Sequence, residues 1–113
     1  RLAARRFDAL ASNSLLHHLA DPAALWSLVA SCLPAGAPVA VMDLRRPDRP
    51  GAVDDLVARY AADEPAVLRD DFRHSLRAAY RADEVAAQLA AAGLAHLTIE
   101  ERGDRHLLIT GRR

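Results

Sequence analysis

The sequence predicts an α/β protein with an open sheet, and three observations carry this prediction. Two apolar segments of strand length, 5–12 and 38–44, flank an amphipathic helical segment. A longer helical stretch covers 51–93, and two further short apolar segments separated by a turn lie within 95–111. The chain is therefore expected to form one domain: a βαβ unit over 5–44, a helical segment and a terminal antiparallel hairpin.

The first helix is delimited by the residues at its two ends. Asp21 can accept hydrogen bonds from the free backbone N–H groups of a first turn. Pro22 suits the first helical position because an N–H group there would have no partner. One apolar stripe at helical spacing follows, before a helix-stopping Pro–Ala–Gly sequence: Leu25, Leu28, Val29, Cys32 and Leu33.

The second strand reads PVAVMDL over 38–44 and carries Asp43 near its end. A continuous apolar run, rather than an alternating one, is typical of a strand that is covered on both sides. We therefore expect parallel strands with helices on both faces of the sheet. The loop over 45–50 is polar and interrupted by prolines, so it can continue neither element.

Three helices are expected between this loop and the hairpin. They cover the region after 51, then 67–79 and 83–92, and Gly93 is placed to end the last one in a left-handed conformation. The turn of the hairpin is expected at 102–104. The apolar positions of the three helices are Val53, Leu56, Val57, Tyr60 and Ala61, then Leu68, Phe72, Leu76 and Ala79, then Val85, Leu89 and Ala92.

Two loops are singled out as the candidate site by this topology alone. In open sheets of this kind, ligands bind beyond the carboxyl ends of the parallel strands. Those ends lead into residues 12–18 after the first strand and 43–46 after the second.

Composition and charge exclude several classes of partner. The chain has 15 arginines, no lysine and 15 acidic residues, so its net charge is zero. Binding to nucleic acid or to an anionic membrane needs a surplus of positive charge on one face, so we expect neither partner. The single cysteine cannot form an intramolecular disulfide, and no apolar stretch is long enough to span a bilayer. We expect a cytoplasmic protein from a GC-rich, bacterial genome.

The ordered segments resemble a known family. FDALASNSLLHHLADPAALWSLVASCLPAGAPVAVMDL resembles the fourth strand, following helix and fifth strand of class I S-adenosylmethionine-dependent methyltransferases. SLRAAYRADEVAAQLAAAGL and HLTIEERGDRHLLITG look like the helix and the antiparallel sixth and seventh strands that end that fold. The resemblance covers nearly the whole chain. It implies a Rossmann-like open sheet, of which 1–113 would be the C-terminal half, a single partial domain.

The sequence departs from the family at the main cofactor motif. Methyltransferases of this class hold S-adenosylmethionine mainly through a Gly-rich loop after the first strand and an acidic residue after the second. Neither is present here, and the five glycines are isolated. Because the chain also begins with Arg1 rather than Met, we expect a missing N-terminal half that carries the first three strands. This chain alone is expected to bind the cofactor weakly or not at all, and to be inactive.

The resemblance implies S-adenosylmethionine as the cofactor and assigns four residues to its methionine portion. These are Asn13, Ser14, Leu15 and His18, which follow the first strand. A short polar side chain and exposed backbone groups could hydrogen-bond the amino-acid moiety. The alternative is that Asn13 and Ser14 only provide turn chemistry where a strand meets a loop.

His17 and Asp43 are the candidate catalytic residues. Methyl transfer requires alignment of the nucleophile, the methyl carbon and the sulfur. An imidazole in the loop after the first strand can take the proton of a hydroxyl or amine nucleophile. Asp43 could orient the substrate or serve as the base. Alternatively, Asp43 only bonds the backbone of the adjacent loop, and His17 and His18 only shape their own loop. Adjacent histidines point in different directions and no second ligand cluster accompanies them, so no metal site is expected.

Further polar residues lie in the helical segment that often covers the substrate in this family. A solvated helix face is the competing interpretation of this set: Arg73, His74, Ser75, Arg77 and Tyr80.

The leading functional hypothesis is S-adenosylmethionine-dependent methyl transfer to a small-molecule O or N nucleophile, by a longer chain of which this is a part. The alternative is a non-catalytic α/β interaction domain. Its exposed first strand would pair with the missing half or with a partner chain, because an uncovered apolar edge invites pairing. A third candidate is the tail of a nucleotide-dependent oxidoreductase on the same scaffold, because a fold does not fix a function.

Overall fold

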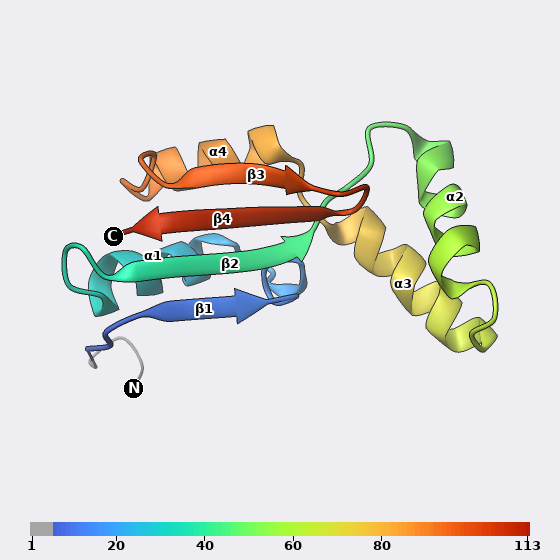
Figure 1. Ribbon diagram of the computed structural model, residues 1–113, viewed down its shortest axis with the longest axis horizontal. Coiled ribbons are helices and arrows are strands. Elements are labelled where there is room, and N and C mark those ends of the chain that lie inside the picture. The colour runs from blue at the N-terminus through green and yellow to red at the C-terminus, as the bar shows by residue number, and fades with distance from the viewer. Residues whose placement is uncertain (1–5) are drawn as a thin grey trace.

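The computed structural model describes residues 6–113 and contains a four-stranded sheet with the order β1-β2-β4-β3 (Figure 1). The strands are β1 (Leu10–Asn13), β2 (Pro38–Leu44), β3 (Thr98–Arg102) and β4 (His106–Arg112). The helices are the short 3-10 helix η2 (Leu16–His18), α1 (Ala23–Cys32), α2 (Pro50–Ala61), α3 (Ala66–Ala78) and α4 (Ala82–Ala91). β1 and β2 are parallel, whereas β4 is antiparallel to both β2 and β3. The predicted βαβ unit and terminal hairpin are therefore confirmed.

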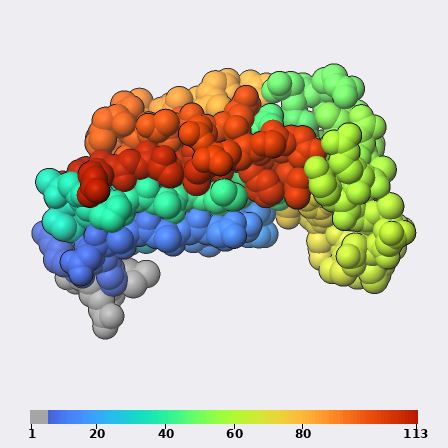
Figure 2. All heavy atoms as spheres, in the orientation of Figure 1, coloured from blue at the N-terminus to red at the C-terminus, as the bar shows by residue number. Residues whose placement is uncertain are grey.

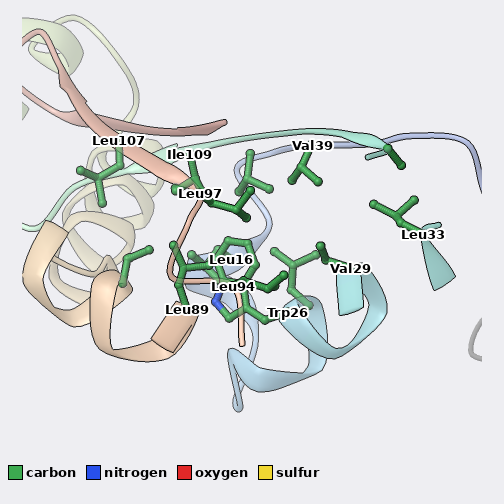
Figure 3. Close-up of a cluster of buried hydrophobic side chains, with 14 residues drawn as sticks. Leu16, Trp26, Val29, Leu33, Val39, Leu89, Leu94, Leu97, Leu107 and Ile109 are labelled. Carbon is green, nitrogen blue, oxygen red and sulfur yellow. The ribbon is translucent and has the colours of Figure 1, made fainter. Parts of the chain in front are cut away.

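The main core lies between the sheet and the two helices α1 and α4, which cover the same face (Figures 1 and 3). Trp26 of α1 is fully buried, and its indole N–H donates a 3.0 Å hydrogen bond to Gln88 Oε1 of α4. Facing them from the strands are four buried side chains: Val39, Val41, Leu107 and Ile109. This hydrogen bond satisfies the one polar atom of a side chain that otherwise fills the centre of an apolar core.

The opposite face of the sheet is open among the described residues (Figure 2). Side chains of β2 alternate between buried and accessible positions, with Ala40 exposed and Met42 partly buried. We expected helices on both faces because 38–44 is continuously apolar, and this part of the prediction is not met within 6–113. The reason is that α2 and α3 pack on each other beyond the end of the sheet rather than over it.

The helices α2 and α3 form an arm with a small core of its own. Its buried residues are Val53, Leu56, Val57, Ala61 and Leu76, with Leu44 and Phe72 packed against them. Arg46 anchors the α3–α4 junction to the end of β2. Its backbone N–H donates to Tyr80 O at 3.1 Å, and its guanidinium bonds Ala79 O at 3.2 Å and Glu84 Oε1 at 2.7 Å.

Several boundaries differ from the prediction for physical reasons. The first strand was expected over 5–12, but β1 begins at Leu10 because its partner strand begins at Pro38 and Leu10 pairs with Val39. Before it, the Phe7 backbone N–H bonds Cys32 O at 2.9 Å, so residues preceding β1 run along the end of α1. Position 5 lies outside the described residues.

Two predicted apolar positions of the arm are accessible. Tyr60 is 43% exposed and Leu68 48% exposed, although the periodicity placed both on apolar faces. Gly93 has φ +74° directly after α4, so its predicted left-handed role is confirmed. Asp21 also acts as predicted, because its side chain accepts the Ala23 backbone N–H at 3.0 Å, although α1 begins one residue later than expected.

None of the described helices combines the length and the apolar character needed to cross a membrane. β1 is the edge strand of the order β1-β2-β4-β3. Among residues 6–113 it pairs with β2 alone, so the other backbone edge of β1 has no described strand beside it.

Candidate functional site

The two loops singled out by the topology meet at one end of the sheet. Because β1 and β2 are parallel, their carboxyl ends lie side by side, and the Ser14 backbone N–H bonds Met42 O at 2.9 Å. η2 follows at once and packs against both β2 and α3. Its tight turn buries Leu16 and His17 while His18 stays exposed. The candidate site therefore lies between the sheet end and the helical arm.

Asp43 and His17 form a buried dyad at this edge. Asp43 shares the covered face of β2 with Val39 and Val41 and is only 2% exposed. Its Oδ2 accepts the His17 backbone N–H at 3.1 Å, and its Oδ1 bonds His17 Nδ1 and accepts the Leu44 backbone N–H at 2.7 Å. The carboxylate is thus satisfied by backbone and imidazole groups, as burial of a charged group requires.

This geometry fixes which imidazole nitrogen carries the proton. A carboxylate can only accept, so Nδ1 donates to Asp43 and Nε2 of the neutral ring keeps its lone pair. Nε2 is buried and has no hydrogen-bond partner among the described residues. A carboxylate that orients an imidazole in this way, with an unprotonated second nitrogen that bonds no described residue, is the arrangement of a general base.

A hollow of about 340 Å³ lies beside the dyad, between η2 and α3. The rings of His17 and His18 are adjacent there, with centroids 4.0 Å apart. The lining residues are His17, His18, Asp71, His74, Ser75 and Ala78. The four from α3 recur at helical spacing, so a single face of that helix forms the far wall.

The residues predicted to contact the cofactor lie along the loop after β1. Asn13 and Leu15 are exposed, and Ser14 adopts φ +60°, a left-handed conformation that is uncommon outside glycine. The Ser14 hydroxyl donates to Asn13 Oδ1 at 3.1 Å, which leaves the Asn13 amide N–H groups available. Exposed backbone and side-chain hydrogen-bonding groups on this loop have the chemistry that the amino-acid end of S-adenosylmethionine would require. Since no Gly-rich loop follows a described strand, these residues fit only that end of the cofactor.

Not every predicted residue belongs to one cluster. The structure brings His17, His18 and Asp43 together, and it places Asn13 to Leu15 on the adjoining loop. It also adds Asp71, which the sequence analysis missed. The helical spacing of Asp71 with His74 and Ser75 was the signal that could have found it. Within the described part of the chain, no three His, Cys, Asp or Glu side chains are arranged to hold a metal ion.

A second polar cluster stabilises the hairpin turn near α2. The Tyr60 hydroxyl donates to Asp104 Oδ2 at 2.6 Å, and the Arg105 guanidinium lies 3.6 Å from the centroid of the Tyr60 ring. Hydrogen bonds from Tyr60, Arg105 and Arg59 lower the pKa of Asp104 to about 2. Burial, and then the charge of Arg105, lower the pKa of His106 at the start of β4, which favours its neutral form.

Comparison with known proteins gives matches among solved structures alone. The sequence matches no protein-family model and no curated protein. An O-methyltransferase family protein from Burkholderia thailandensis aligns over 98% of this chain, with a TM-score of 0.57 and 17% identity. The pyocyanin biosynthetic protein PhzM aligns over 100% of it, with a TM-score of 0.52 and 17% identity.

The chain has a methyltransferase fold. A protein from Nostoc punctiforme PCC 73102 also aligns, over 95% of the chain with a TM-score of 0.53 and 15% identity. These alignments cover 32%, 33% and 32% of the respective neighbours, so the chain spans about a third of the length of the structures it matches. The expected open α/β sheet and its resemblance to methyltransferases are confirmed at the level of the fold.

Proposed function

We propose that this methyltransferase fold serves S-adenosylmethionine-dependent transfer of a methyl group to an O or N nucleophile of a small molecule, in the cytoplasm. The observation that carries the proposal is the buried Nε2 of His17, which bonds none of the residues 6–113 and belongs to a ring held by Asp43 at the edge where open sheets of this kind bind ligands. The neighbouring hollow of about 340 Å³ has a volume within the range of small-molecule sites.

His17 acts as the general base in this proposal, and Asp43 positions it. The cofactor supplies an electrophilic methyl group when bound. His17 Nε2 would take the proton of the acceptor hydroxyl or amine as the sulfonium S–CH3 bond gives way to the new bond, and the Asp43 carboxylate would stabilise the resulting imidazolium. Asn13, Ser14, Leu15 and His18 would border the methionine portion of the cofactor from the adjoining loop.

The described residues supply only one side of a cofactor site. A Gly-rich loop that would cradle the remainder of S-adenosylmethionine is absent from the sequence. We therefore propose that the reaction requires a longer chain and that this chain alone does not turn over. The near-zero charge and the lack of arginine in the hollow favour a small-molecule acceptor over nucleic acid.

The test is methyl transfer from S-adenosylmethionine by the whole protein that the natural gene encodes, assayed against a panel of small hydroxyl and amine acceptors. His17→Ala should lower kcat by about 10²-fold or more if the imidazole is the base. Asp43→Asn should lower kcat as well, since the amide no longer fixes the imidazole tautomer. His96→Ala is the matched control, because His96 is exposed and bonds Arg112 O at the other end of the sheet.

Two outcomes decide against parts of this proposal. A loss below about threefold for His17→Ala would assign the catalysis to alignment of the reactants alone. Absence of methyl transfer to every acceptor, in a folded protein that carries the upstream region, would reject the methyltransferase function.

A non-catalytic interaction domain remains the second candidate, because one specific feature favours it. Beside the edge of β1 that has no described strand neighbour lies an apolar groove of about 240 Å³. Its lining residues are Phe7, Ala9, Leu10, Ala11, Leu28, Cys32 and Leu33. An uncovered strand edge next to an apolar groove suits an added strand from a partner chain or from a preceding segment.

Light scattering over a concentration series tests this second candidate on the 113-residue chain. Self-association that Ala9→Asp abolishes would support pairing through the β1 edge, because the new carboxylate lies in the apolar groove. A well-folded monomer at all concentrations would count against it. Asp48→Asn, at an exposed loop position away from β1, provides the control.

A further inference from the structure

The helix α3 presents two chemically different faces. Leu76 is fully buried and packs with α2 in the core of the arm. Asp71, His74 and Ser75 instead line the hollow that contains the two histidines of η2. An amphipathic helix normally turns its polar side to bulk water. Asp71 and His74 are accordingly solvent-exposed, and with the partly buried Ser75 they also form the wall of the open hollow opposite the candidate base.

Asp71 and His74 are not used by the fold. The neighbouring Asp70 is bonded to Arg73 at 2.9 Å, and Arg73 also bonds Asp54 at 3.1 Å. In contrast, neither Asp71 nor His74 has a hydrogen-bond or ion-pair partner among the described residues. Two unpaired polar side chains on one wall of a hollow are available to hold a ligand.

The lining sets the chemistry of that ligand. It offers a carboxylate, three imidazoles and a hydroxyl, and none of its members is an arginine, although the chain contains 15. A carboxylate accepts hydrogen bonds and does not donate, so Asp71 requires a donor group such as a hydroxyl or an amine. A carboxylate or phosphate on the ligand would meet Asp71 with no cation in the lining to offset the repulsion.

We propose that Asp71 and His74 bind a second polar group of the methyl acceptor and thereby select acceptors that carry two neighbouring hydrogen-bond donors. This inference rests on the proposed function, since it takes the nucleophile to lie at His17 Nε2. The second donor then meets Asp71 and His74 across the same hollow. Attachment at two points fixes the orientation of the nucleophile, which is the main requirement of the transfer.

Catechol, phenol and salicylate distinguish the elements of this proposal. Catechol carries two adjacent hydroxyls, phenol lacks the second, and salicylate replaces it with a carboxylate. In the whole protein, kcat/KM for catechol should exceed that for phenol by about tenfold, in the range of one hydrogen bond to a charged group. Asp71→Asn and His74→Leu should each reduce this ratio to below about threefold by lowering kcat/KM for catechol, because the acceptor is then bound and oriented less well, while kcat/KM for phenol should stay nearly unchanged.

Matched variants separate a role in selection from a general loss of structure. Asp70→Asn removes the adjacent carboxylate, and His96→Leu removes a distant exposed imidazole, so both should keep the preference for catechol. Asp71→Asn should in addition raise the relative turnover of salicylate. A catechol-to-phenol ratio that stays unchanged in both Asp71→Asn and His74→Leu would overturn the inference while leaving the proposed function intact.

A binding measurement keeps the inference testable if no methyl transfer is found. Catechol titrated into the 113-residue chain should shift the imidazole NMR resonances of His74, and Asp71→Asn should weaken this binding at least about fivefold. If catechol binds in this way but the whole protein transfers no methyl group, the methyltransferase function is rejected and the binding site at Asp71 and His74 is supported. No shift of His74 with catechol, together with an unchanged acceptor preference in active protein, would remove the site.

Discussion

The Asp43 carboxylate bonds both the backbone and the imidazole of His17. One carboxylate oxygen accepts the His17 backbone N–H at 3.1 Å, and the other bonds the imidazole Nδ1. The two residues are 26 positions apart, so the dyad ties η2 to the end of β2. It therefore stabilises the fold and orients the candidate base at once.

Removing the Asp43 carboxylate should destabilise the protein. Asp43→Ala leaves the buried N–H groups of His17 without an acceptor, and unmade buried hydrogen bonds of this kind cost about 2–4 kcal/mol together. Urea denaturation followed by circular dichroism measures the loss. Asp54→Ala is the control, because its exposed pair with Arg73 should contribute less than about 1 kcal/mol. Equal losses for the two variants would contradict the structural role of the dyad.

The imidazole tautomer of His17 gives a second, independent test. With Asp43 accepting from Nδ1, nitrogen NMR of the neutral ring should report a protonated Nδ1 and an unprotonated Nε2. Asp43→Ala should abolish this preference, whereas exposed His18 should show the same tautomer mixture in both proteins. A neutral His17 protonated at Nε2 in the native chain would exclude it as an acceptor of the nucleophile's proton.

Local patterns were sufficient to predict some elements and insufficient for others. β2 spans the predicted 38–44, because an apolar run bounded by a glycine turn and prolines leaves little freedom in its ends. β1 begins later than predicted, since the length of a strand depends on the partner to which it pairs. The end of α4 was predictable from Gly93, whose left-handed φ is a property of the residue itself.

The site was predictable in its location but not in its contacts. Topology placed His17 and Asp43 at one edge, yet whether Asp43 turned inward depended on which face of β2 the helices cover. The wall formed by Asp71 depended on how α3 packs against η2, which no local pattern contains. Tyr60 fitted an apolar periodicity, but its hydroxyl found Asp104 in the hairpin turn, and the ring stayed half-exposed.

Two glycines should respond oppositely to substitution by alanine. Gly111 has φ +145°, and a Cβ there would lie 2.9 Å from Leu97 Cδ2 in a buried contact, so Gly111→Ala should cost about 1–3 kcal/mol. Gly51 lies in α2, and a Cβ there would meet only the Arg49 guanidinium at 3.9 Å, so Gly51→Ala should stabilise by up to about 1 kcal/mol. Thermal unfolding of both variants checks the pair. If the Gly111→Ala protein were as stable as the native chain, the close approach of Leu97 to Gly111 would not restrict the residue at position 111.

Asp104 makes the hairpin cluster sensitive to acid. Its pKa is lowered from 3.8 to about 2, chiefly by the Tyr60 hydroxyl and then by its arginine neighbours. Because the pKa of Asp104 is lower in the folded state than in the unfolded state, its carboxylate contributes fully to folding stability above the unfolded-state pKa. This contribution is lost as the pH falls from about 4 to about 2. NMR titration of the Asp104 carboxyl should give a midpoint near 2 in the native chain. The midpoint should rise in Tyr60→Phe, and an unchanged midpoint there would contradict the assigned cause.

Arg46 should control how firmly the arm is attached. Its backbone and guanidinium bond the junction between α3 and α4, and its pair with Glu84 is about two-thirds buried, with exposed side-chain fractions of 33% and 36%. Arg46→Ala should therefore favour local opening of α3, and hydrogen exchange of α3 amides should accelerate about tenfold if about 1.4 kcal/mol is lost. Amides of α1, in the main core, should keep their exchange rates.

Arg49→Ala is the control for this last experiment, because Arg49 is exposed and forms a long pair of 3.5 Å with Asp55. It should leave exchange in α3 unchanged. Uniform acceleration of α1 and α3 in Arg46→Ala would mean that the whole domain is destabilised and that the arm does not open separately. Selective acceleration would show that α3, the wall opposite His17, opens independently of the sheet when the Arg46 anchor is removed.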